Sequence, residues 1–376
     1  MALRNMPTLQ HFDKVNIHDK DTVEDNSVKK VSKFDEINKK AEELFKIIPV
    51  PIISYSQEAG NVFGLTKFNA FRIDKNDTLS DYSKISEVFT FSTKGHINAS
   101  ISTNLNFSEN KWMVMGYVNY KKRPEYILGI GNDVKKEDAE LITIDRVKFF
   151  NIVLRNITSH FYLGTGVDLN NTFKVEKDST SFLIKNNITG KDGGFTLGLG
   201  LTAAWDSRDN KYNAHTGTYA LLGYLYYPKV TDVTTEFHTF QFDLRHFFVP
   251  WKKHVIAMQL ATNYSSGDVP FYELSKLGGE ERMRGYYEGA LRDKVLLDGQ
   301  IEYRMPVWKI FGIVGWVGCG RVADKYSNLS LDGFRPSYGL GLRIKVDSAS
   351  DINMRLDFGK GIKGVSGFYI NFAEAF

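Results

Sequence analysis

The feature that most constrains the fold is a two-residue alternation of apolar and polar side chains, which begins at Val50 and continues to the end of the chain. The stretches GLGLRIKVD at 339–347 and DINMRLDF at 351–358 show it without interruption. Because successive side chains of a β-strand point to opposite faces, this period predicts strands with one apolar and one polar face. No helical period interrupts it after Val50.

The alternation and the turn signals between its segments predict sixteen strands. An even strand number, with short turns on one side and longer loops on the other, is typical of an outer-membrane barrel. The expected strands begin near residues 50, 61, 86, 96, 112, 140, 159, 194, 216, 235, 254, 295, 310, 337, 351 and 366. The predicted fold class is all-β: a 16-stranded antiparallel transmembrane β-barrel over residues 50–376, preceded by a short N-terminal amphipathic helix.

Alternation alone leaves open which face is wet, since a large soluble β protein would turn its apolar faces inward. The polar faces carry charges at mid-strand, as at Asp298, Glu302 and Arg304, which suits a water-filled lumen. No strand is expected to be apolar on both faces, as strands in buried sheets usually are. We therefore expect the apolar faces to contact lipid, with the soluble β protein as the alternative.

Residues 1–49 differ from the rest and form a polar segment that we expect on the periplasmic side. Its last part predicts an amphipathic helix over about 32–48, with Pro49 ending it. The apolar residues of this helix recur three or four positions apart: Phe34, Ile37, Ala41, Leu44 and Ile48. We expect this helix to pack against a neighbouring element. The alternatives are that it plugs a pore or lies on a membrane surface. No signal peptide is visible, because residues 1–13 lack an apolar core.

Composition excludes several function classes. Lys plus Arg number 48 and Asp plus Glu 44, a balance that gives no basic footprint for nucleic acid. Cys319 is the single cysteine, so neither an intrachain disulfide nor a cysteine zinc site is expected. The eight histidines show no metal-ligand spacing, and phosphate-loop and Gly-x-Ser-x-Gly patterns are missing. We therefore expect no enzyme activity, no metal and no cofactor.

One motif lies in the long connection before the expected twelfth strand, which reads LGGEERMRGYYEG at 277–289. An arginine carried into a lumen needs a carboxylate, and Gly285 permits a turn where a side chain would clash. Glu302, on the polar face of the next strand, is the first candidate partner of Arg284, and Asp298 or Asp357 could substitute. The alternative is that Arg284 is a solvated loop residue.

This motif resembles the signature loop of the outer-membrane protein assembly and translocation superfamily, the BamA/TamA-like barrels of the bacterial surface antigen type. In that family the sixth external loop folds back into the lumen, and its tip reads Val-Arg-Gly-Phe or Val-Arg-Gly-Tyr. Here the loop is 276–294 and its tip is Met283, Arg284, Gly285 and Tyr286. The family commonly adds an aspartate on the thirteenth strand, where this chain has Gly318.

The resemblance covers residues 50–376, and it implies an insertion signal at the end of the chain. The candidate residues share one face of the terminal strand: Phe368, Ile370, Phe372 and Phe376. Glu374 lies on the same face and is expected near the aqueous rim. Family members carry periplasmic POTRA domains before the barrel, whereas residues 1–49 are too few for one, so we expect a short form.

The resemblance implies a protein of the bacterial outer membrane that acts in or alongside membrane-protein insertion or export. Its partners would be outer-membrane lipids and client barrel proteins or a periplasmic accessory protein. The expected mechanism is a weak seam between the first and last strands, where unpaired backbone groups template a client strand. The alternatives are a channel plugged by residues 32–48 and a barrel that anchors a separate periplasmic or surface protein.

Overall fold

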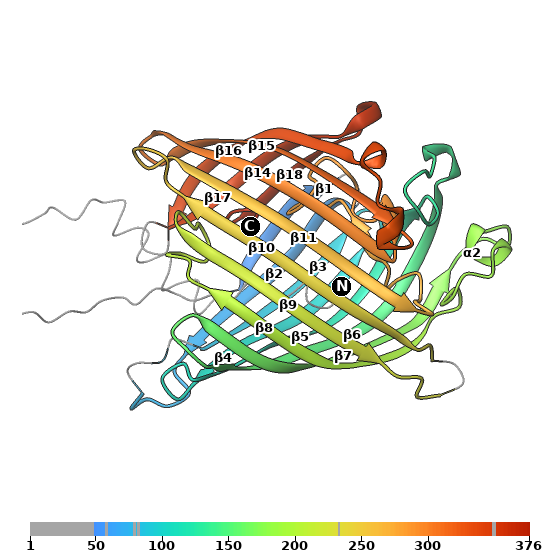
Figure 1. Cartoon of the computed structure of the whole chain (residues 1–376), viewed down its shortest axis with the longest axis horizontal. Helices are drawn as coiled ribbons and strands as arrows, with labels where there is room; N and C mark the ends of the chain where they lie inside the picture. The colour runs from blue at the N-terminus through green and yellow to red at the C-terminus, as the bar shows by residue number, and fades with distance from the viewer. Residues whose placement is uncertain (1–48, 57–58, 78–79, 81–82, 232–233, 348–350) are drawn as a thin grey trace, which may run out of the picture.

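The computed structural model describes residues 49–56, 59–77, 80, 83–231, 234–347 and 351–376. Sixteen strands form one antiparallel sheet, which confirms the predicted all-β class and the predicted number of strands. The sheet rolls around a central space, with strands tilted to its long axis (Figure 1). The expected helix over 32–48 lies outside the described residues. None of the helices in the described ranges is long and apolar enough to cross a membrane.

Each strand of the sheet pairs with its neighbours in chain order, except that β11 pairs directly with β14. The sixteen strands are β1 (Val50–Ser56), β2 (Gly60–Phe71), β3 (Ser83–Ser92), β4 (Ile97–Phe107), β5 (Trp112–Ile127), β6 (Glu140–Asn156), β7 (Phe161–Glu176), β8 (Gly194–Asp206), β9 (Gly217–Tyr227), β10 (Phe237–Phe248), β11 (Val255–Gly267), β14 (Val295–Trp308), β15 (Phe311–Ala323), β16 (Arg335–Asp347), β17 (Ile352–Lys360) and β18 (Ser366–Phe372).

The remaining elements lie in the connections. A separate two-stranded sheet, β12 (Ser275–Leu277) with β13 (Leu291–Asp293), lies between β11 and β14. The short helices are α2 (Phe182–Lys185), η2 (Lys136–Asp138), η3 (Tyr326–Asn328), η4 (Leu331–Gly333) and η5 (Ile362–Gly364).

The two edge strands of the sheet, β1 and β18, approach each other, but the described sheet order contains no ladder between them. Both are 7 residues long, whereas β5, β6 and β7 have 16, 17 and 16 residues. At about 3.3 Å per residue, a 7-residue strand spans only about 23 Å before its tilt is counted. The wall is therefore lowest where the edge strands meet.

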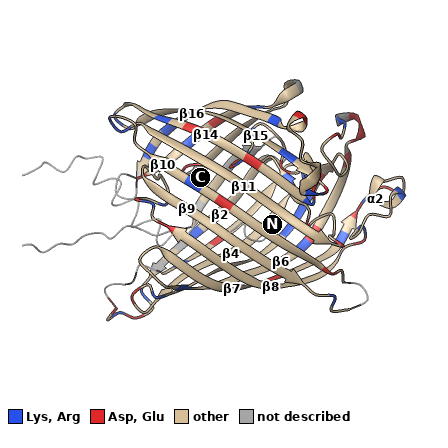
Figure 2. Ribbon diagram, viewed as in Figure 1, with Lys and Arg blue, Asp and Glu red and all other residues tan. Residues whose placement is uncertain are grey.

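The outer face is apolar along the strands, and the inner face carries many charged side chains. Leu201, Val317 and Leu340 are 60–69% exposed and alternate with inward-facing residues. Charged residues also occur in mid-strand, away from the ends of the sheet (Figure 2). Exposed tryptophans stand near the turns at one end of the sheet, as in the aromatic girdle of membrane barrels: Trp112, Trp205, Trp251 and Trp308.

The expectation that no strand is apolar on both faces is wrong for β9. Leu222 and Tyr224 are exposed on its outer face, while Tyr219, Leu221 and Leu225 are buried on its inner face. Outer-face residues contact lipid in a membrane barrel, so only the inner face reports what fills the lumen. The inner face of β9 is packed in a hydrophobic cluster rather than wet.

Candidate functional site

The connection from β11 to β14 folds back against inward-facing side chains of the sheet. We call residues 276–294 the lumen loop. Its hairpin pairs Lys276 with Arg292, and Gly289 N–H donates to the Leu277 carbonyl at 2.9 Å. A small hydrophobic cluster holds the loop against the wall: Leu277, Met283, Tyr286, Leu291, Leu296 and Val322.

The tip of the lumen loop lies directly against the backbone of β17. Met283 and Gly285 have φ values of 53° and 104°, which turn the chain sharply. A Cβ on Gly285 would lie 2.8 Å from the backbone of Lys360, and a Cβ on Gly359 would lie 2.7 Å from the Arg284 carbonyl carbon. The tip therefore requires glycine on both sides of the contact. The Gly285 N–H donates to the Tyr369 hydroxyl of β18 at 3.0 Å.

This close approach carries the Arg284 side chain into the wall, where its exposed fraction is 0%. Arg284 Nη2 lies 2.6 Å from Glu302 Oε2 on β14, and Nη1 lies 2.7 Å from Asp357 Oδ2 on β17. The guanidinium carbon stands 3.7 Å from the ring centre of Trp316 on β15. One side chain thus joins three strands through two charge-assisted hydrogen bonds and a stacked contact.

More charges surround this pair and form what we call the arginine cluster. Its members are Arg284, Arg304, Arg343, Arg355, Glu302, Asp357 and Glu374. Arg304 Nε lies 2.8 Å from Glu302 Oε1. Arg343 bridges Asp357 and Glu374 at 2.5 and 2.7 Å, and Arg355 Nη1 lies 3.1 Å from Asp357 Oδ2. Four guanidinium groups thus face three carboxylates, all buried.

The structure places the other predicted residues in different ways. The Tyr286 hydroxyl donates to the Pro336 carbonyl at 2.9 Å, which fixes the tip against β16. Asp298 stands apart from Arg284 and lies 3.6 Å from Arg282 Nη1. At Gly318 there is no side chain to reach Arg284, and the position two residues earlier on β15 supplies the Trp316 ring instead. The alternation identifies Glu302, but it does not indicate Trp316 or Arg343 as contacts.

The base of the lumen loop is fixed on the far wall by a buried carboxylate outside the arginine cluster, which the sequence analysis did not identify. Glu125 of β5 lies 3.1 Å from Arg292, 3.5 Å from Lys276 and 3.5 Å from Arg123. Burial lowers the pKa of Lys276 to about 7. The charges of Arg292 and Arg123 act in the same direction, and the charge of Glu125 opposes them. The sequence feature that could have indicated this contact is the charged residue Glu125 at an inward-facing position near the end of β5.

The terminal strand departs from its predicted arrangement. Phe368 and Ile370 are exposed on the outer face, but β18 ends at Phe372 and Ala373 takes a φ of 63°. Phe376 is buried inside the barrel, 6.2 Å from the Phe247 ring, so it does not share the outer face. Glu374 is buried beside Arg343 rather than at the rim. The role of these residues as an insertion signal stays a prediction.

These contacts are ion pairs and hydrogen bonds that join the lumen loop to the strands. None of them pairs a nucleophile with a base. Among the described residues no group of histidine, cysteine and carboxylate side chains could hold a metal ion.

Comparison with protein families matches residues 62–376 to the Omp85 superfamily domain. Among solved structures, the chain is similar to BamA from Haemophilus ducreyi lacking POTRA domains 1–3, with a TM-score of 0.56 and 14% identity, over 89% of this chain and 77% of that one. It is also similar to CdiB from Acinetobacter baumannii (TM-score 0.55, 12% identity, 86% of this chain, 59% of that one). The similarity to CdiB from Escherichia coli has a TM-score of 0.55 and 10% identity, over 86% of this chain and 62% of that one. Comparison with curated protein sequences finds no match.

Proposed function

The chain belongs to the Omp85 superfamily, and from this premise we propose that it acts in the insertion or export of proteins at the bacterial outer membrane. In this role it works without enzymatic chemistry, on client β-strands or together with a periplasmic accessory protein. Lipids of the outer membrane surround its apolar face.

One observation carries the proposal: β1 and β18 meet, but the residues that the structure describes form no ladder between them. Every other neighbouring pair of strands in the described sheet forms an antiparallel ladder. Edge strands present unpaired N–H and C=O groups, which in hydrocarbon cost several kcal/mol each unless another strand pairs with them. A client strand that pairs there removes this cost, so the seam favours strand addition.

The height of the wall supports the same role. A membrane strand needs about 9–11 residues to cross the bilayer, and β1 and β18 have 7 each. The lipid beside the seam must thin to match these short strands, which lowers the barrier to inserting a client there. The arginine cluster keeps the rest of the wall in shape, because it joins β14, β16 and β17 to the lumen loop.

Quantitative proteomics of the outer membrane after depletion of this protein tests the role. We expect other β-barrels to fall several-fold with their transcripts unchanged. An unaltered barrel inventory would overturn the proposal. In that case capture of a stable periplasmic or surface partner would support an anchoring role instead.

The mechanism has its own test. In a Cys319→Ser background, cysteine pairs scanned along residues 50–56 and 366–372 should yield a disulfide that locks the seam and blocks insertion until it is reduced. A matched control is the pair Thr165→Cys and Leu201→Cys, which face each other on β7 and β8. Full activity with the seam locked would exclude strand addition there.

A further inference from the structure

Two cations face each other on the inner wall of the barrel, on the strands that lie beside Glu125. Lys121 of β5 and Arg146 of β6 are directly opposite each other in the antiparallel ladder. Both occupy inward-facing positions, which alternate along the strands with the exposed outer-face residues Val118 and Val147. Like charges directly opposite in a ladder repel each other and destabilise the pairing. The pair therefore calls for a negative charge between its members.

The row of ladder partners that contains this pair holds no carboxylate. From β4 to β7 the row reads Asn98, Lys121, Arg146 and Thr172. Asn119 Nδ2 donates to Asn98 Oδ1 at 2.7 Å, so the NH₂ group is the end of the Asn98 amide that can donate to another group. Three neighbouring strands thus carry an amide, an ammonium and a guanidinium group side by side, and all three are hydrogen-bond donors.

The carboxylates on either side of this row already have cations of their own. Each of these carboxylates lies 2.7–3.6 Å from another cation: Glu125 from Arg292, Glu288 from Arg123, and Asp168 and Glu273 from Lys148. Asp145, which precedes Arg146, occupies a position opposite Lys122, on the other face of the sheet. Within the described ranges neither Lys121 nor Arg146 forms an ion pair, so the row carries two cations without a direct counterion.

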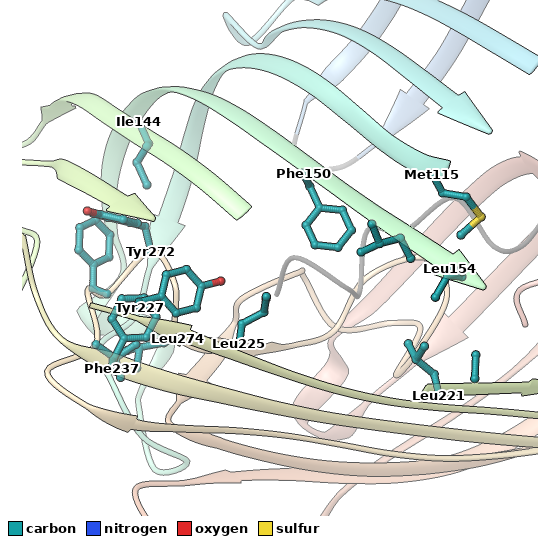
Figure 3. Close-up of a cluster of buried hydrophobic side chains, with 14 of the residues drawn as sticks. Met115, Ile144, Phe150, Leu154, Leu221, Leu225, Tyr227, Phe237, Tyr272 and Leu274 are labelled. Carbon is teal, nitrogen blue, oxygen red and sulfur yellow. The ribbon is translucent and has the colours of Figure 1, made fainter. Parts of the chain in front are cut away.

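Apolar side chains border the pair and strengthen its electrostatics. Ile144 and Phe150 lie on either side of Arg146 on the inner face of β6, and both point into the barrel (Figure 3). Both are buried and belong to the large hydrophobic cluster. Charges interact more strongly beside apolar groups than in water, because the local dielectric constant is lower. The repulsion between the two cations is therefore poorly screened, and an anion between them is held more tightly for the same reason.

We propose that Lys121 and Arg146, together with the Asn98 amide, bind a phosphate group inside the barrel. A phosphate monoester carries about two negative charges near neutral pH, which match the two cations, whereas a carboxylate would leave one cation uncompensated. The guanidinium fork of Arg146 suits two of its oxygens, and the ammonium and amide groups suit the others. The phosphate is either a free ion or the headgroup of a lipid. This site does not depend on the insertion role.

Thermal unfolding of the full-length protein in detergent, with inorganic phosphate as the probe, tests the proposal. Because a ligand of the folded state stabilises it, the midpoint temperature should rise saturably with phosphate, and much less with chloride at the same ionic strength. Lys121→Met and Arg146→Met should each weaken the affinity for phosphate at least tenfold. In phosphate-free buffer Lys121→Met should raise the midpoint, because it removes the repulsion. Lys122→Met, one position along on the other face, is the control and should keep the full phosphate response.

Equal effects of phosphate and chloride would overturn the proposal, and so would a phosphate response that both variants retain or that the Lys122→Met control also loses. Titration with a short-chain phosphatidic acid, below its micelle concentration, distinguishes the two sources of the phosphate. Binding at least tenfold tighter than that of inorganic phosphate, and lost in Lys121→Met, assigns the site to a lipid headgroup. Equal or weaker binding assigns it to the free ion.

Discussion

Replacing Glu302 should destabilise the barrel more than replacing its partner Arg284. When Arg284 becomes Gln, Glu302 keeps Arg304 at 2.8 Å and Asp357 keeps Arg343 at 2.5 Å. Three guanidinium groups then face three carboxylates, and the loss is that of a charged hydrogen-bond donor, about 1.5–3 kcal/mol. When Glu302 becomes Gln, four guanidinium groups face two carboxylates, and buried charge left uncompensated costs about 3–5 kcal/mol.

Equilibrium unfolding of the barrel in detergent micelles measures both losses. Tryptophan fluorescence is a suitable signal, since Trp316 lies directly under Arg284. The double variant should lose less than the sum of the single losses by at least about 1 kcal/mol, as contacting residues do. Lys174→Ala is the control, because its pair with Glu176 is exposed and should leave stability unchanged. Equal losses, the reverse order or simple additivity would refute the charge-count argument.

Three further predictions concern the tip, the base of the loop and the terminal residue. Gly359→Ala should lower the midpoint temperature of heat modification, because the new Cβ clashes with Arg284 at a cost of about 1–3 kcal/mol. Gly315→Ala is the control and should leave the midpoint unchanged, because its Cβ would lie 3.5 Å from its nearest neighbour. The pKa of Lys276 is about 7 in the folded protein and near its ordinary value of 10.5 in the unfolded chain, so between these pH values only the unfolded chain holds the proton. The free energy of unfolding should therefore rise from pH 7 to pH 9, and Lys276→Met should remove that rise. Phe376→Ala should cost about 3–5 kcal/mol, because the ring is buried, while Phe368→Ala, at an outer-face position that is 45% exposed, should cost much less in the same unfolding assay.

Much of the fold could be predicted from the sequence because alternation is a local property. Sixteen strands follow from it, and so does the inward position of Glu302. The contacts of Trp316 and Arg343 depend instead on how far neighbouring strands are staggered, which no single segment encodes. Phe376 turns inward through the backbone of Ala373, a residue type that seldom adopts a positive φ.

The inner face of β9 was mispredicted for a different reason. The alternation of apolar and polar residues identifies the inner face of a strand only if that face contacts water. The inner face of β9 is instead packed in a hydrophobic cluster. A strand with two apolar faces therefore indicates that something lies inside the barrel, rather than that the sheet belongs to a soluble core.

The contacts of the lumen-loop tip also order the assembly of the protein itself. Arg284 binds Glu302, 18 residues later in the chain, and Asp357, 73 residues later, and the Gly285 N–H reaches Tyr369, 84 residues later. During synthesis and threading, the tip meets its last partners only when the final two strands arrive. The tip can therefore be completed only in a chain that includes both strands, because a chain that ends before residue 357 leaves Arg284 with Glu302 as the one carboxylate of this described pair.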